Sequence, residues 1–244
     1  MPYLEIENLS LTLDGKKLLD NISFSAEKAT ITLIAGLNGS GKSLLLRSIK
    51  GLEKIDKGRI CIEGREMARC RERMERIALV FQDTELQIVG TTVEKDIAFG
   101  PENQGMKRDE ISRIVEGLLS EFSMTDKKDL YPEVLSGGER RKLCIMGVLA
   151  MSPSILLLDE PFANLDYPST LTVIRMLDLL KARGMTVIIV SHEAEKFLAH
   201  TDRTLILEKG RVKVEGKSYE MMDALRENGI YLPKNASFKD LSWL

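Results

Sequence analysis

The sequence predicts an α/β fold: a parallel sheet covered by helices, with an N-terminal antiparallel β subdomain and an inserted α-helical subdomain. Short β-branched and apolar segments alternate with helical stretches in the second half of the chain, a pattern typical of parallel sheets. A glycine-rich loop at residues 36–43 lies between an apolar strand and a helix. From about residue 106 to residue 150, strand patterns give way to helical periodicity, and this change marks the insertion.

Each element follows from its periodicity and from the turn residues at its ends. Asp14 and Gly15 form a tight turn between the first two strands. Strands are expected over residues 4–7, 21–25, 30–35, 58–64, 77–81, 155–158, 186–190 and 204–207. Helices are expected over residues 44–49, 111–119, 140–149, 170–181 and 221–225, with a charged, solvated helix face over 65–76. One domain therefore spans residues 1–215, with the helical subdomain at about 90–150 and a short tail at 216–244.

Composition indicates a soluble globular protein and argues against several other classes. The chain has 244 residues, of which 43% are hydrophobic and 30% are charged. Its net charge of −2 does not favour a nucleic-acid or membrane-surface binder. The sequence shows neither an uninterrupted apolar stretch of membrane-spanning length nor a signal-peptide pattern. Three cysteines without paired spacing predict reduced thiols in a cytosolic protein.

The glycine-rich loop has the residues of a phosphate-binding loop. Its residues are Gly36, Leu37, Asn38, Gly39, Ser40, Gly41, Lys42 and Ser43. Glycines let backbone N–H groups turn towards phosphate oxygens, and the helix that follows directs its positive end at the same oxygens. We expect Lys42 to reach the β- and γ-phosphates and Ser43 to place its hydroxyl on Mg²⁺. An ordinary glycine turn would not require Lys42 and Ser43, so the loop predicts binding of a nucleoside triphosphate.

Two carboxylates follow a second apolar strand, at residues 155–158. Because ligands bind at the carboxyl ends of strands in open α/β sheets, these acids are expected at the same site. Asp159 is expected to hold Mg²⁺, and Glu160 to polarise the water that attacks the γ-phosphate. An Asp-Glu pair after a strand is often only the start of a polar loop, but the phosphate-binding loop in the same chain favours the catalytic interpretation.

A second anion-binding helix end is predicted at Ser136, Gly137, Gly138 and Glu139. These residues lie about twenty positions before the strand that carries Asp159, and a helix is expected to follow them. The alternative is an ordinary serine N-cap. One nucleotide does not need two anion-binding helix ends on the same chain, so the presence of the second one has to be explained.

The order of these motifs resembles that of an ATP-binding cassette (ABC) ATPase. The matching elements are the phosphate-binding loop, Gln82, Ser136 with its glycines, Asp159 with Glu160, Asn164 to Asp166, and Ser191 with His192, over residues 3 to about 215. The resemblance implies a P-loop NTPase fold with a RecA-like parallel sheet core, and it implies ATP and Mg²⁺ as ligands. It also implies that two cassettes pair head to tail, each completing the other's site.

The resemblance gives further residues their expected roles. Gln82 resembles the residue that senses Mg²⁺ and the attacking water, and His192 resembles the switch that contacts the γ-phosphate. Asp166 resembles the loop that links the two sites of the pair. The segment from Ser136 to Glu139 would then serve the nucleotide of the partner cassette, which explains the second cradle.

A finer resemblance connects the chain with the ATPases of energy-coupling factor (ECF) transporters. It rests on residues 81–89, 92–103 and 147–153. It implies an ATPase that powers uptake of vitamins, cobalt or nickel, works at the cytoplasmic face of the cell membrane, and receives a coupling helix from integral membrane subunits after Gln82. The second cassette would be a copy or a paralogue, and no nucleic acid is expected as partner. The alternatives are a conventional ABC transporter subunit, a non-transport soluble ABC ATPase, and a purely packing role for residues 87–103.

Two positions depart from the family pattern. Leu13 stands where an aromatic residue usually stacks on adenine, an interaction worth about 1–3 kcal/mol. We therefore expect ATP binding that is weakened roughly tenfold but not lost. Glu139 stands where glutamine is common, but a carboxylate at a helix start is itself stabilised, so we expect a working site.

Overall fold

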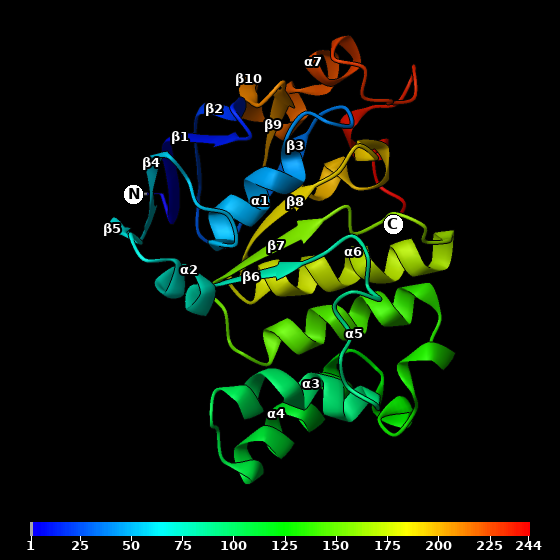
Figure 1. The fold of residues 1–244 in the computed structure, drawn as a ribbon. Helices are drawn as coiled ribbons and strands as arrows, with labels where there is room; N and C mark the ends of the chain where they lie inside the picture. Colours follow the sequence, from blue (N-terminus) through cyan, green and yellow to red (C-terminus); the bar gives the residue numbers. More distant parts are fainter. Residues whose placement is uncertain (1) are drawn as a thin grey trace.

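The computed structural model describes residues 2–244, which form two sheets with helices around them (Figure 1). The strands are β1 (Leu4–Leu13), β2 (Lys16–Ala26), β3 (Ile31–Ala35), β4 (Lys57–Ile62), β5 (Arg65–Glu66), β6 (Ile77–Val80), β7 (Ile155–Asp159), β8 (Thr186–Val190), β9 (Arg203–Glu208) and β10 (Arg211–Lys217). The helices of six or more residues are α1 (Lys42–Lys50), α2 (Cys70–Arg76), α3 (Val93–Asn103), α4 (Arg108–Glu121), α5 (Gly137–Leu149), α6 (Tyr167–Ala182) and α7 (Met222–Glu227).

The central sheet has six strands in the order β10-β9-β3-β8-β7-β6. All neighbours from β9 to β6 are parallel, and only β10 is antiparallel, at one edge. Every residue of β3, β7 and β8 is buried, because helices and the second sheet cover both faces. The expected α/β fold with a parallel core is confirmed.

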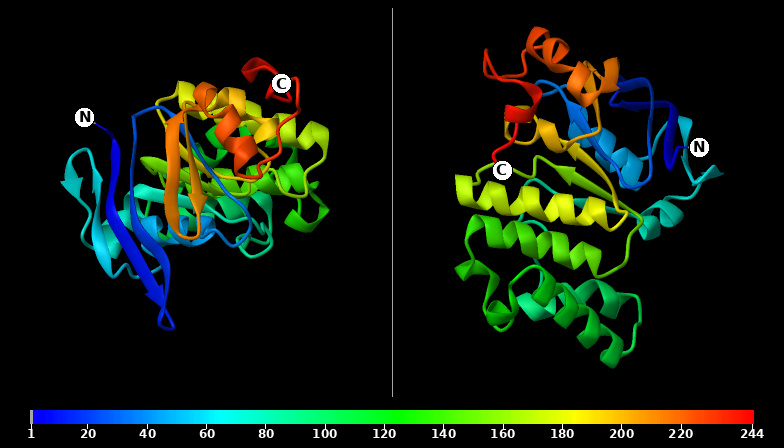
Figure 2. Two further views of the ribbon diagram at one scale, coloured as in Figure 1. Left: turned by 90° about the horizontal axis from the view of Figure 1, so that it is seen from above. Right: turned by 180° about the vertical axis from the view of Figure 1, so that it is seen from behind.

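The second sheet is antiparallel, in the order β2-β1-β4-β5, and it packs with α1 against one face of the central sheet. Helices α3 and α4, which contact each other, lie at the opposite end of the molecule, next to α5 (Figures 1 and 2). The N-terminal antiparallel part and the inserted helical part are both present. Because α3 begins at Val93, the helical character starts earlier than the pattern at residue 106 indicates.

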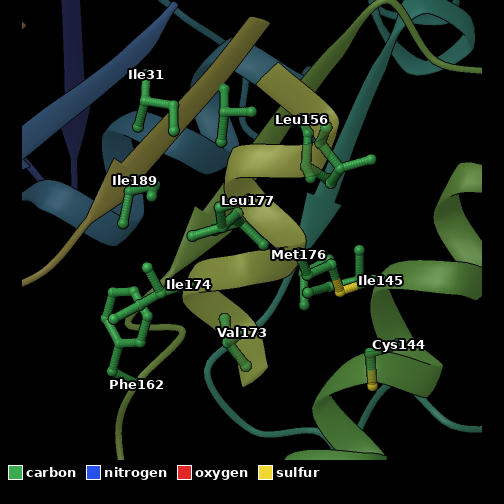
Figure 3. Packing of buried hydrophobic residues seen from close by; sticks show 14 of the residues in the cluster. Ile31, Cys144, Ile145, Leu156, Phe162, Val173, Ile174, Met176, Leu177 and Ile189 are labelled. Carbon is green, nitrogen blue, oxygen red and sulfur yellow. The ribbon is translucent and has the colours of Figure 1, made fainter. Parts of the chain in front are cut away.

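Helix α6 joins the inserted helices to the sheet. Its apolar side chains point both ways in Figure 3, towards Ile145 on α5 and towards Leu156 and Ile189 on the strands. The side chains Val173, Ile174, Met176 and Leu177 of α6 are at most 3% exposed. This continuous packing fixes α5 against the edge of the sheet where the functional residues lie.

Two regions differ in detail from the expectation. The charged segment 65–76 is a two-residue strand followed by helix α2, and Arg73 on that helix is only 3% exposed, where its guanidinium donates to Met67 O. A solvated helix face is therefore wrong for Arg73. The chain after β10 packs on the central core through α7 and a final segment, in which Leu225 and Leu241 are fully buried.

Candidate nucleotide site

Four adjacent strands of the central sheet each end at a predicted site residue. The phosphate-binding loop follows β3, His192 follows β8, Asp159 and Glu160 end β7, and Gln82 follows β6. Since β3, β8, β7 and β6 are neighbours in that order and parallel, their carboxyl ends meet at one edge. The sheet thus brings together groups that are more than a hundred residues apart in sequence.

The phosphate-binding loop depends on two glycines for its shape. Gly41 has φ 102° and caps α1, and a Cβ there would lie 3.0 Å from Leu19 Cδ2. At Gly36 a Cβ would lie 2.4 Å from Leu207 O, which no side chain could tolerate. The Lys42 side chain is 6% exposed and donates to Gly36 O at 2.8 Å, so its ammonium group lies over the loop.

Ser43 and Asp159 form an oxygen-rich pair beside the loop. Ser43 Oγ donates to Asp159 Oδ1 at 3.0 Å. Burial raises the pKa of Asp159 and lowers the pKa of Lys42, so both charges have lost water without full compensation. Hydroxyl, carboxylate and the nearby Gln82 amide are hard oxygen donors, the kind that suits Mg²⁺. The residues present therefore fit a magnesium–nucleotide pair.

Glu160 is held in a constrained position at the centre of the site. The backbone of Glu160 has φ 45°, a value that is unusual for any residue other than glycine. Its N–H donates to Val190 O at 2.9 Å. Its carboxylate contacts His192 twice: His192 Nδ1 lies 3.0 Å from Oε1, and the His192 N–H donates to Oε2 at 3.3 Å. Lys42 Nζ lies 3.9 Å from Glu160 Oε1. The carboxylate is 7% exposed and thus fixed in orientation.

Most of these groups line one cleft of about 510 Å³, and Asp159, which is not part of the lining, lies next to it through its hydrogen bond with Ser43. Its lining contains Asn38, Gly39, Gly41, Lys42, Ser43, Gln82, Glu160 and His192, together with Leu18 and Leu44. Gly36, Leu37 and Ser40 line a separate, smaller cavity behind the loop, of about 200 Å³. The cleft has the size and polarity expected for a phosphate chain and a metal ion.

The second predicted cradle lies outside this cleft. Ser136 caps α5 and forms a reciprocal capping box with Glu139, whose Oε2 accepts the Ser136 N–H at 2.9 Å. A hydrogen bond from Lys127, followed by the Ser136 N–H, lowers the pKa of Glu139, so this carboxylate is charged and already partnered. Gly137 lines another cavity, of about 550 Å³, together with Gln82 and Asn164.

Two further predicted residues also lie away from the cleft. Asp166 caps α6, and its Oδ1 accepts the Ser169 N–H at 3.0 Å. Leu13 is 52% exposed at the end of β1 and does not line the cleft. In one molecule, therefore, the structure assembles the phosphate and metal half of the predicted site and leaves Gly138, Ser136, Glu139, Asp166 and Leu13 outside it.

Sequence reasoning missed three residues around the site. Leu18 on β2 lines the cleft, and no pattern in the sequence distinguishes it from other strand leucines. Arg141 on α5 is 2% exposed and donates to Phe81 O and Gln82 O. Arg141 lies three residues before Cys144 and four residues before Ile145, so it shares the apolar face of the expected helix. This spacing was the signal in the sequence that Arg141 is buried. Gln87, whose Oε1 accepts the Phe81 N–H at 2.9 Å, lies in the stretch that the sequence singled out for coupling or packing, but its contact with the Phe81 backbone was not predicted.

A parallel sheet that delivers a phosphate-binding loop, paired acids, a glutamine and a histidine to one edge defines a nucleoside triphosphatase. The ABC transporter family model matches residues 19–163 of the chain. The chain belongs to the ABC transporter family, as an ATP-binding and ATP-hydrolysing cassette.

Several characterised proteins are similar over nearly the whole chain. The energy-coupling factor transporter ATP-binding protein EcfA of Carboxydothermus hydrogenoformans is 38% identical over 94% of this chain and 87% of that protein. The cobalt import ATP-binding protein CbiO of Rhodobacter capsulatus is 35% identical, over 95% and 86%. The structure of CbiO1 from Clostridium perfringens, part of the ABC transporter complex CbiONQ, superposes with a TM-score of 0.85 at 30% identity and covers 96% of both chains.

Proposed function

We propose that this chain is the ATP-hydrolysing subunit of an ECF-type importer of vitamins or transition-metal ions. The observation that carries the proposal is similarity to EcfA and CbiO cassettes across more than nine-tenths of the chain, including the inserted helices. In the described residues no helix is long and apolar enough to cross a bilayer. By its similarity to the ATP-binding subunits of importers, the chain would act as a peripheral subunit at the cytoplasmic face of the membrane, bound to integral partners.

The chemistry that we assign to the cleft follows from the contacts of its residues. Lys42 and the N-terminus of α1 would bind the phosphate chain, and Ser43, Asp159 and Gln82 would hold Mg²⁺. Bound Mg²⁺ would neutralise charge on the β- and γ-phosphates. Glu160 accepts a proton from the attacking water at its carboxylate, while His192 keeps that carboxylate oriented from its other side.

We further propose that each site is completed by a second cassette. Ser136, Gly137 and Gly138 form a capped helix N-terminus outside the cleft of their own molecule, where backbone N–H groups suit an anion from another molecule. Asp166 lies close in sequence to Asn164, which shares a cavity with Gly137. In a head-to-tail pair, ATP would lie between Lys42 of one subunit and Ser136 of the other, and hydrolysis would separate the subunits.

The coupling surface that we propose is a groove between α3 and α5. It has a volume of about 310 Å³, and residues lining it include Gln87, Val89, Phe99, Asn103, Gly147 and Val148. Val89 is 59% and Phe99 47% exposed, and Leu86, nearby in sequence, is 80% exposed, so an apolar patch borders the groove. An apolar helix from a membrane subunit fits such a groove.

Copurification with an integral membrane partner tests this function. The chain, expressed in its native cells and extracted with mild detergent, should copurify with hydrophobic subunits. Phe99→Asp should abolish the association and leave the ATP hydrolysis of the purified chain intact, because Phe99 lies outside the cleft. Met74→Asp, at a similarly exposed position on α2, is the matched control and should retain the partner. Purification of the wild-type chain without any membrane protein would refute the proposal.

A further inference from the structure

The chain segment that carries Gln82 is held by side chains from two directions. From α5, Arg141 Nη1 donates to Phe81 O at 2.6 Å and Nη2 donates to Gln82 O at 2.7 Å. From the loop after β6, Gln87 Oε1 accepts the Phe81 N–H at 2.9 Å. The backbone just before and at Gln82 is thus fixed by three hydrogen bonds that belong to neither helix nor sheet.

The Arg141 contact is costly to bury and is specific in its geometry. Arg141 is 2% exposed, and its Nε is buried without a hydrogen-bond partner among the residues that the structure describes. Burial lowers the pKa of this guanidinium, so no carboxylate compensates fully for the lost water. A planar fork that reaches two successive carbonyl groups cannot be replaced by a single ammonium group. A helix–sheet contact needed only for packing would be served by an apolar side chain.

Both holding residues connect Gln82 to the groove between α3 and α5. Gln87 lines the groove itself. Arg141 lies one turn before Cys144 on α5, and Cys144, Gly147 and Val148 of the same helix line the groove. Arg141 also lies one turn after Ser136, the residue that caps α5. A shift of α5 would therefore move the carbonyl partners of Arg141, and with them the base of the Gln82 side chain.

We propose that Arg141 and Gln87 are positioning residues: together they clamp the Phe81–Gln82 backbone and set the position of the Gln82 side chain in the cleft. The clamp does not depend on which membrane partner the chain binds. Its effect on Gln82 is a property of the chain alone and can be measured without a membrane partner.

The purified full-length chain is compared as wild type, Arg141→Lys, Arg141→Met and Gln87→Met. Arg141→Met should lower kcat about tenfold while the KM for ATP stays within about twofold, because the nucleotide contacts are intact and only the placement of Gln82 changes. Arg141→Lys keeps one donor group and should fall between wild type and Arg141→Met, and Gln87→Met should show a smaller loss. Arg113→Met, an exposed arginine on α4, is the matched control and should leave kcat unchanged.

Two readouts separate the clamp from a purely structural effect. In a Gln82→Ala background, Arg141→Met should cost less than about twofold in kcat, since residues that act through one group are not additive. The gain in affinity for a fluorescent ATP analogue on adding Mg²⁺ should shrink in Arg141→Met and not in Arg113→Met. Full additivity with Gln82→Ala, or an unchanged kcat in folded Arg141→Met, would overturn the proposal.

The proposal can still be tested if one of the variants does not fold. If Arg141→Met is insoluble, Arg141→Lys and Gln87→Met carry the same two readouts, and wild-type kcat in both would also overturn the proposal. Failure of the wild-type chain to copurify with a membrane subunit would refute the proposed function and leave the clamp standing. The two proposals therefore fail separately.

Discussion

At the scale of single residues, the site is defined by how Glu160 is held. A positive φ, a backbone hydrogen bond to β8 and two contacts with His192 leave its carboxylate one orientation. Such strain is maintained only when the surroundings determine it from several sides. The sequence identifies Glu160 by its place after an apolar strand, but the contact with His192 depends on β7 and β8 being neighbours, which the sequence does not state.

Glu160→Gln tests the role of this carboxylate. The amide keeps the size of the side chain but cannot accept the proton of water, so kcat should fall by about 10²–10⁴-fold. Since binding is unaffected, ATP should then hold two molecules together as a stable dimer, detectable by light scattering. Glu116→Gln, on the exposed face of α4, is the control for a lost negative charge and should behave as wild type. Wild-type turnover in Glu160→Gln would remove Glu160 as the general base.

Leu13→Tyr tests the predicted weakness of the base contact. If Leu13 stands beside adenine, an aromatic ring there should tighten ATP binding by up to about tenfold, as measured by calorimetry, since stacking is worth about 1–3 kcal/mol. Leu86→Tyr, at a residue that is 80% exposed and does not line the cleft, should leave the affinity unchanged. Unchanged affinity in Leu13→Tyr would show that the base lies elsewhere, with Leu18 as the available apolar contact in the cleft.

At the scale of elements, α5 combines several surfaces on one helix. Its N-terminus is capped by Ser136, its middle clamps Gln82 through Arg141, and its later turns line the groove with Cys144 and Gly147. The sequence assigned a specific contact only to the first of these, because Ser136 and its glycines form a local motif. The other two depend on which strand and which loop the helix meets, and that is decided by tertiary packing.

The same distinction explains what could be predicted elsewhere. Strand ends were found because buried apolar runs and glycines mark them locally, as at β3 and β7. The helical subdomain was expected from about residue 90, but α3 was not among the individual helices expected, and Gly100 and Pro101 near its end are both poor helix formers. Arg73 was assigned to solvent on charge alone, but its helix packs beside α1 and buries it.

The burial of Cys144 on α5 can be tested by thiol labelling. Burial raises the pKa of Cys144 to about 12 and raises that of Cys61, so both thiols stay protonated, and a protonated thiol is a poor nucleophile. Cys70 is exposed at the start of α2. At pH 8, iodoacetamide should modify Cys70 alone in the folded protein, as read by peptide mass spectrometry, and Cys70→Ser should abolish labelling. Because thiolate forms only near the pKa, raising the pH to 9 should leave Cys144 unmodified, and rapid labelling of Cys144 would contradict its burial.

At the scale of the whole molecule, the proposed pairing would let one chain supply one half to each of two sites. The cleft that contains Lys42 and the helix end at Ser136 do not meet within one molecule. A head-to-tail pair of identical chains contains two equivalent composite sites, each taking one half from each subunit.

Mixing two inactive variants tests this arrangement. Lys42→Ala disables the phosphate-binding half and Ser136→Arg blocks the other half, so each variant alone should be inactive. In an equal mixture, half of the pairs are mixed and each mixed pair keeps one intact site, so about a quarter of wild-type ATPase activity should return. A mixture of Lys42→Ala with Glu160→Gln, both in the same half, is the control and should stay inactive. No recovery in the first mixture would contradict a shared site.

The strand order of the central sheet has a further consequence for how tightly each functional residue is held. Strands β3, β8 and β7 each have a hydrogen-bonded neighbour on both sides, whereas β6 pairs only with β7 and forms the edge. An edge strand opens locally at a lower free energy than strands inside a sheet, so its backbone amides exchange with solvent sooner. The phosphate-binding loop, Glu160 and His192 thus follow strands in the interior of the sheet, whereas Gln82 follows an edge strand, so its backbone depends on the hydrogen bonds from Arg141 and Gln87 for what sheet pairing does not supply.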